Sequence, residues 1–92
     1  MLLTVDMGNT NITIGAFEED ELKFTARLST IRGKTVDQYA LEFNQVFKLN
    51  KVRASDFSAG ILSSVVPELT DVIMQTIANL TGTPAMLIGP GI

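Results

Sequence analysis

The stretch Asp6-Met7-Gly8-Asn9-Thr10-Asn11 carries the residue types best suited to phosphate chemistry. Gly8 can adopt a positive φ and lets a ligand approach the backbone. Successive backbone N–H groups of such a turn can form an anion nest, and the side chains of Asn9, Thr10 and Asn11 add donors. Asp6 would repel phosphate unless Mg²⁺ lay between them, and Mg²⁺ binds one or two carboxylates together with phosphate oxygens and water. The stretch therefore suits a nucleoside triphosphate with its metal, although the same residues also favour a tight turn without a ligand.

Other candidate motifs carry less chemistry. Gly33-Lys34-Thr35 matches the end of a P-loop, but Leu28 stands where that motif needs its first glycine. Ser63 and Ser64 are possible nucleophiles, but the chain has no histidine to activate them, so a structural role is favoured. The segment Gly89-Pro90-Gly91 is either a simple turn or a backbone-lined wall for a substrate.

The composition restricts the function classes. A chain of 92 residues with 46% hydrophobic and 18% charged residues predicts one folded domain over residues 1–92. The absence of cysteine and histidine excludes disulfides, thiolate metal sites and a Ser-His-Asp triad. A net charge of −3 argues against nucleic acid as a partner, and the basic residues Arg27, Arg32 and Lys34 are interpreted as an ordinary solvated stretch. Without a membrane-spanning run or a signal peptide, we expect a soluble cytoplasmic domain and no membrane contact.

The elements that position these residues begin with three predicted strands. Residues 1–5 are nearly all apolar, as in a strand buried on both faces. Residues 11–18 and 22–30 follow with alternating patterns, and in the third strand we expect an inward set, namely Leu22, Phe24, Ala26 and Leu28. Short links predict antiparallel neighbours.

Two helices and two strands follow. Thr35 and Gln38 form a capping box before the first helix. Residues 59–66 predict a buried strand, Pro67 begins a second helix that Gly82 ends, and residues 85–88 predict a short strand. The order βββαβαβ with right-handed crossovers predicts an α/β fold with a mixed sheet of order 3-2-1-4-5, in which only strand 2 is antiparallel.

This topology also predicts where the site lies. Ligands of open α/β sheets bind outside the carboxyl ends of the parallel strands. Residues 6–11, Ser63-Ser64 and Gly89-Pro90-Gly91 should all meet at that edge. Their predicted convergence favours phosphate binding over an empty turn.

With Asp6-Met7-Gly8-Asn9-Thr10-Asn11 opening a hairpin, Ser63-Ser64-Val65-Val66-Pro67, and the closing Gly89-Pro90-Gly91-Ile92, the chain resembles the type III pantothenate kinases. The resemblance covers the whole chain. It implies a ribonuclease H-like fold of the actin-like and sugar-kinase ATPase superfamily. It also implies ATP-dependent phosphorylation of pantothenate, the first step of coenzyme A synthesis, by a homodimer that uses Mg²⁺ and a monovalent cation, K⁺ or NH₄⁺.

Carried over to this sequence, the resemblance assigns residue roles. Asp6 belongs to the metal and phosphate motif. The ATP phosphates would lie against the remainder of that motif and its margin, namely Met7, Gly8, Asn9, Thr10, Asn11, Ile12 and Thr13. Gly89, Pro90 and Gly91 would lie near pantothenate.

Family members are more than twice as long and carry a Gly-Ala-Asp-Arg motif, with the general base, after the Gly-Pro-Gly segment. We therefore expect no catalytic residue in this chain, a general base beyond Ile92, and no kinase activity from residues 1–92 alone. Three alternatives stay open: a noncatalytic nucleotide-binding or transcriptional accessory protein of the same superfamily, a small structural domain, and a ribonuclease H-like nuclease. The nuclease would need several convergent carboxylates, and only Asp6 is placed at the predicted edge.

Overall fold

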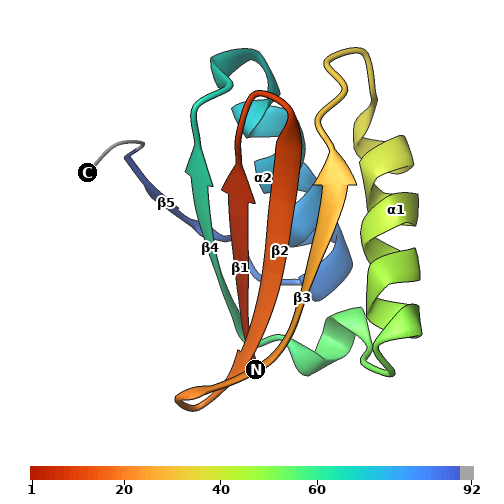
Figure 1. Ribbon diagram of the computed structural model, residues 1–92, viewed down its shortest axis with the longest axis vertical. Coiled ribbons are helices and arrows are strands. Elements are labelled where there is room, and N and C mark those ends of the chain that lie inside the picture. Colours follow the sequence, from red (N-terminus) through yellow and green to blue (C-terminus); the bar gives the residue numbers. More distant parts are fainter. Residues whose placement is uncertain (90–92) are drawn as a thin grey trace.

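Five strands form one mixed sheet, and both helices pack against one of its faces (Figure 1). The computed structural model describes residues 1–89. In chain order the elements are β1 Leu2–Met7, β2 Asn11–Glu18, β3 Glu21–Ser29, α1 Val36–Leu49, the 3-10 turn η1 Ala54–Asp56, β4 Ala59–Ser64, α2 Pro67–Thr81 and β5 Met86–Ile88. The sheet order is β3-β2-β1-β4-β5, and only β2 runs against the other strands. The predicted topology is confirmed; η1 was not predicted.

The core lies between the sheet and the helices. Alternate residues of β1 and β2 are buried there, namely Leu3, Val5, Met7, Ile12, Ile14 and Ala16. Phe43 and Phe47 of α1 form an aromatic cluster with Phe57, which follows η1; the ring centroid of Phe47 lies 6.4 Å from that of Phe43 and 4.9 Å from that of Phe57. The sequence predicts both faces of β1 to be buried, but Leu2 and Thr4 are only half-buried because the described helices cover one face.

The helix ends follow the predicted signals. The Gln38 N–H donates to Thr35 Oγ1 at 3.2 Å and the Thr35 N–H donates to Gln38 Oε1 at 2.9 Å, so the capping box is present. Pro67 occupies the first turn of α2, and Gly82 ends that helix with φ 75°. Within residues 1–89, neither helix has the length and apolar composition needed to span a bilayer.

The position of Leu22 differs from the prediction. The β2–β3 register shifts at a bulge between Ala16 and Phe17, so Leu22 pairs with Phe17 rather than continuing the inward alternation. One extra residue turns every side chain beyond it to the other face of a strand. Leu22 is therefore 49% exposed and lies near Gly15 on the face without helices, whereas Phe24 packs on the core.

Candidate functional site

The β1–β2 turn connects the central strand to its antiparallel neighbour through three residues, Gly8, Asn9 and Thr10. The Gly8 N–H donates to the Asn11 carbonyl oxygen at 2.8 Å and closes the turn. Gly8 does not use the positive φ that a glycine can adopt; Gly82 is the described glycine that has one. Gly8 instead suits this position by its size, since a Cβ there would lie 3.3 Å from the Asn11 oxygen. The lack of a side chain also leaves the backbone of the turn open to a ligand.

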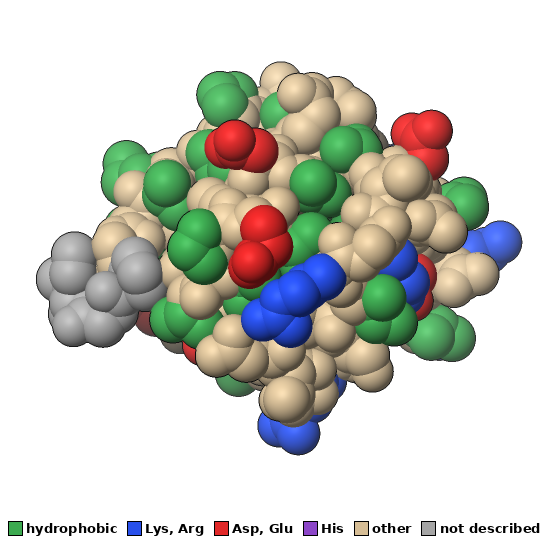
Figure 2. Space-filling model, turned by 90° about the horizontal axis from the view of Figure 1, so that it is seen from above, with side chains coloured by type: hydrophobic (Ala, Val, Ile, Leu, Met, Phe, Trp, Pro, Cys, Tyr) green, Lys and Arg blue, Asp and Glu red, His purple; other side chains and the backbone are tan. Residues whose placement is uncertain are grey.

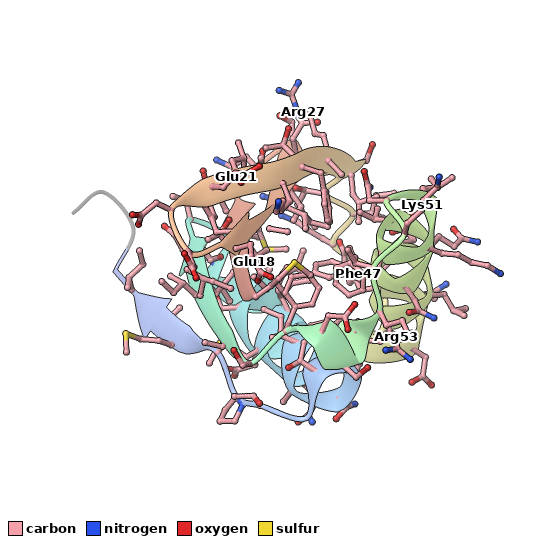
Figure 3. The ribbon with its side chains drawn as sticks, turned by 90° about the horizontal axis from the view of Figure 1, so that it is seen from below. Glu18, Glu21, Arg27, Phe47, Lys51 and Arg53 are labelled. Carbon is pink, nitrogen blue, oxygen red and sulfur yellow. The ribbon has the colours of Figure 1, made fainter. Side chains whose placement is uncertain are left out.

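The strand registers place a polar row across the sheet, close to its carboxyl edge. Asp6 of β1 pairs with Thr13 of β2 and with Ser63 of β4. Thr13 pairs in turn with Arg27 of β3, and Ser63 with Ile88 of β5. Registered partners share a face, and this is the face without helices. Figure 3 shows Arg27 pointing away from both helices. Sequence analysis did not predict that Thr13 pairs with Asp6, or that Arg27 lies in the same row beyond Thr13.

Asp6 presents the carboxylate of this row to solvent. Asp6 is exposed, and its carboxylate forms no hydrogen bond or ion pair with any other residue in the range 1–89. In the same range no three acidic side chains lie close enough to hold a metal ion by themselves. A single unpaired carboxylate fits Mg²⁺, which takes one or two protein carboxylates and completes its shell with phosphate oxygens and water. It does not fit a metal held by protein ligands alone.

The polar side chains of the turn face outward. Asn9, Thr10 and Asn11 are all exposed. The Asn11 amide donates to Thr10 Oγ1 at 3.1 Å, which leaves the Thr10 hydroxyl free to donate to a ligand. Met7 and Ile12, by contrast, are fully buried in the core, so any contact that they make with a phosphate comes from their backbone.

The loop between β3 and α1 is hydrogen-bonded to the turn. The Thr30 N–H donates to the Thr10 carbonyl oxygen at 2.9 Å, and Thr30 Oγ1 donates to the Gly8 carbonyl oxygen at 2.8 Å. Nη2 of Arg32 donates to Oδ1 of Asn9 at 3.0 Å. Three successive residues of the turn are thereby held by one neighbouring segment.

Sequence reasoning missed this loop. The sequence analysis interprets Arg32 as part of a solvated basic stretch, and its side chain is indeed half-exposed. Arg32 nevertheless lies at the turn, because β3 ends beside it. The signal was the hairpin itself: once Asn11 pairs with Ser29, the residues after Ser29 must lie beside the turn. Lys34 differs from Arg32, since its Nζ forms an ion pair with Glu42 at 2.7 Å.

Tyr39 and Glu68 also help to hold Arg32 beside the turn. The hydroxyl of the buried Tyr39 donates to the Ile31 carbonyl oxygen at 2.7 Å and accepts from the Ile31 N–H at 2.9 Å, which fixes the residue before Arg32. The Arg32 guanidinium also lies 3.7 Å from a carboxylate oxygen of Glu68, in the first turn of α2. Figure 2 looks down on this edge and shows basic and acidic side chains next to each other.

The two serines of β4 have different surroundings. Ser64 is buried; its Oγ accepts from the Val66 N–H at 3.1 Å and from Thr70 Oγ1 at 3.0 Å, so it joins β4 to α2. This is the structural role that the sequence favoured. Ser63 lies beside Asp6 in the polar row.

The third predicted segment lies partly outside the described residues. Gly89 follows β5 directly, next to the strand end at which Ser63 pairs with Ile88. This places Gly89 at the carboxyl edge of the sheet, as predicted. Pro90 and Gly91 lie outside the described residues.

Comparison with known sequences gives a consistent result. The sequence pattern that defines type III pantothenate kinases matches residues 2–92. The type III pantothenate kinase of Finegoldia magna is 40% identical over 88 residues, which are 96% of this chain and 34% of that protein. The enzymes of Geobacter sulfurreducens and Moorella thermoacetica are 38% and 39% identical over 92 residues, which are all of this chain and 36% of each relative. The chain therefore spans about a third of the length of the curated relatives that it matches.

Solved structures support the fold. A ROK hexokinase from Thermus thermophilus aligns with a TM-score of 0.68 and 19% identity, over 96% of this chain and 33% of that one. RuvC from the same organism aligns with a TM-score of 0.57 and 14% identity, over 97% of this chain and 63% of that one. At these identities the likeness concerns the fold alone. The fold is the ribonuclease H-like, actin-like one that the resemblance implied.

Proposed function

The chain belongs to the type III pantothenate kinase family, and from this premise we propose that the protein containing it transfers the γ-phosphoryl group of ATP to pantothenate. The product is 4′-phosphopantothenate, and the reaction is the first step of coenzyme A biosynthesis. We propose a cytoplasmic homodimer as the working form, with Mg²⁺ and a monovalent cation, K⁺ or NH₄⁺, as its ions.

The observation that carries the proposal is the pairing of an open turn with an unpaired carboxylate at one edge of the sheet. Gly8 leaves the turn backbone accessible, and Asn9 and Thr10 offer side-chain donors beside it. Asp6 lies at the end of the central strand, with Ser63 next to it. Phosphoryl transfer depends mainly on positioning and on neutralising phosphate charge, and this edge supplies groups for both.

We assign the roles as follows. The turn residues Gly8, Asn9 and Thr10, with Asn11 and Thr13 at the margin, hold the ATP phosphates. Asp6 holds Mg²⁺, directly or through water, and bound Mg²⁺ supplies positive charge to the phosphate oxygens. Gly89, at the carboxyl edge of the sheet, lies near pantothenate in this proposal. The base that takes the proton of the pantothenate hydroxyl lies outside these 92 residues.

The test is an assay of the complete protein with MgATP and pantothenate, following both ADP release and phosphopantothenate formation. Asp6→Asn keeps the size of the side chain and removes its charge. We expect it to lower kcat/KM by about 100-fold, the order found when support for a bound metal is lost. Asp20→Asn is the matched control, because Asp20 lies in the exposed β2–β3 turn at the other end of the sheet. Full activity of Asp6→Asn would remove Asp6 from this role.

The same assay, together with a measurement of MgATP binding, separates the proposal from the noncatalytic alternative. A nucleotide-binding accessory protein would bind MgATP, and Asp6→Asn would weaken that binding, but the wild-type protein would form no phosphopantothenate. A small structural domain would neither bind MgATP nor form phosphopantothenate.

A further inference from the structure

We infer that Arg32 is a positioning residue for the phosphate turn: it holds the side-chain oxygen of Asn9, so that the amide NH₂ of Asn9 is directed to the ATP phosphates. The inference rests on the proposed function, because it adds a residue to the same site. Arg32 comes from the β3–α1 loop, 23 residues along the chain from Asn9.

The chemistry of the asparagine amide is the first step. An amide side chain has an acceptor end and a donor end, and a phosphate needs the donor end. Arginine has donors only, so it can bind Oδ1 of Asn9 and not Nδ2. The 3.0 Å contact between Nη2 of Arg32 and Oδ1 of Asn9 therefore selects one of the two amide orientations. In that orientation the NH₂ group remains available for an anion.

The second step is that Arg32 is itself held. Tyr39 fixes the backbone of Ile31 with two hydrogen bonds, and Thr30 is bonded to the turn on the other side of Ile31. The guanidinium also lies 3.7 Å from Glu68. This ion pair is weak, because both side chains are at least half-exposed, at 50% and 60%. Hydrogen bonds thus fix the backbone just before Arg32, and the guanidinium lies against two oxygens, the carboxamide oxygen of Asn9 and a carboxylate oxygen of Glu68.

The third step excludes the other nearby cations from this role. Lys34 is engaged by Glu42 at 2.7 Å and lies 5.5 Å from the centre of the Tyr39 ring. Arg27 belongs to the polar row on β3, on the face of the sheet without helices. Within residues 1–89, Arg32 is the basic side chain that is hydrogen-bonded to the turn.

The experiment measures binding of MgATP and of magnesium tripolyphosphate to the complete protein, and the KM for MgATP. Arg32→Ala should raise the Kd for both probes by about fivefold, the size expected of an exposed charged contact. The two probes should change equally, because the effect is at the phosphates. Arg32→Lys can still donate to Asn9 Oδ1 and should recover part of the loss. Arg53→Ala, which removes the same charge near the opposite end of the sheet (Figure 3), should stay within about twofold of wild type.

The decisive measurement is the double variant. If Arg32 acts through Asn9, Arg32→Ala should have no further effect in a protein that already carries Asn9→Ala. Independent, multiplying effects would overturn the inference, since Arg32 would then act on the phosphate directly or only on the fold. An Arg32→Ala protein that binds both probes like wild type would also overturn it. Binding without pantothenate phosphorylation would refute the proposed function alone, because the coupling between Arg32 and Asn9 would still be measured. No binding by the wild-type protein would refute both.

Discussion

Replacing Tyr39 by Phe tests how the core of this protein holds the β1–β2 turn. The substitution keeps the buried ring and removes only the hydroxyl, which bonds both backbone groups of Ile31 at 2.7 and 2.9 Å. Each hydrogen bond contributes about 0.5–1.5 kcal/mol net, and a buried group that loses its partner costs about 1–3 kcal/mol. Ile31 is partly exposed, so water can replace some of the loss. We expect a decrease of about 1–2 kcal/mol in the free energy of unfolding.

The assay is equilibrium urea unfolding followed by circular dichroism. With an m-value of about 1 kcal/mol/M for a domain of this size, the midpoint should fall by about 1–2 M at unchanged m. Thr76→Val is the matched control: it removes a fully buried hydroxyl that bonds only the Val72 carbonyl one turn earlier in α2, at 2.8 Å. That carbonyl belongs to the helix and keeps its backbone donor, so the control should change stability by less than about 0.5 kcal/mol. Equal losses of unfolding free energy in the two variants would show that the two hydrogen bonds from Tyr39 to Ile31 add no stability beyond that of a buried hydroxyl.

Three other substitutions test the strands and helix ends. Gly15→Ala should lower the free energy of unfolding by about 1–3 kcal/mol, because the new Cβ would lie 2.6 Å from Thr4 Oγ1. Adding Thr4→Ala to that variant should recover most of the loss, and the urea midpoints of the two variants measure both effects. Ser64→Ala should cost about 1–3 kcal/mol in the same measurement, since it leaves a buried N–H without its acceptor, whereas Ser63→Ala should cost less than about 0.5 kcal/mol. Gly82→Ala should lower the melting temperature through a loss of about 1 kcal/mol, because φ is 75° there; an unchanged melting temperature would contradict the left-handed cap.

The sheet order could be predicted because it follows from connection lengths. Links too short for a crossover force antiparallel neighbours, and each helix connects two strands that run parallel to each other. The same topology predicts that Asp6, Ser63 and Gly89 lie at one edge of the sheet, and the strand registers agree. The helix limits were predictable for a similar reason, since Thr35 and Gly82 act through local geometry alone.

The errors arose where one residue changes the geometry of its neighbours. Alternation predicts Leu22 in the core, but the bulge at Ala16 and Phe17 reverses the side chains beyond it, and nothing in the hydrophobic pattern marks that bulge. Glycine can adopt a positive φ, but Gly8 does not use that freedom. Its actual requirement is a 3.3 Å approach to the Asn11 carbonyl, which depends on the closed turn.

The side chains of Asn9, Thr10 and Asn11 in the β1–β2 turn are all exposed, so they add no buried packing that would hold the turn in place. Apart from its closing hydrogen bond between Gly8 and Asn11, an exposed turn of this kind is ordered by the contacts that it receives from neighbouring segments. Those contacts come from Thr30 and Arg32, whose loop is fixed by the buried hydroxyl of Tyr39. The packing of α1 on the sheet therefore sets the position of the turn. Substitutions that displace Tyr39 should weaken MgATP binding even where the sheet and both helices stay folded.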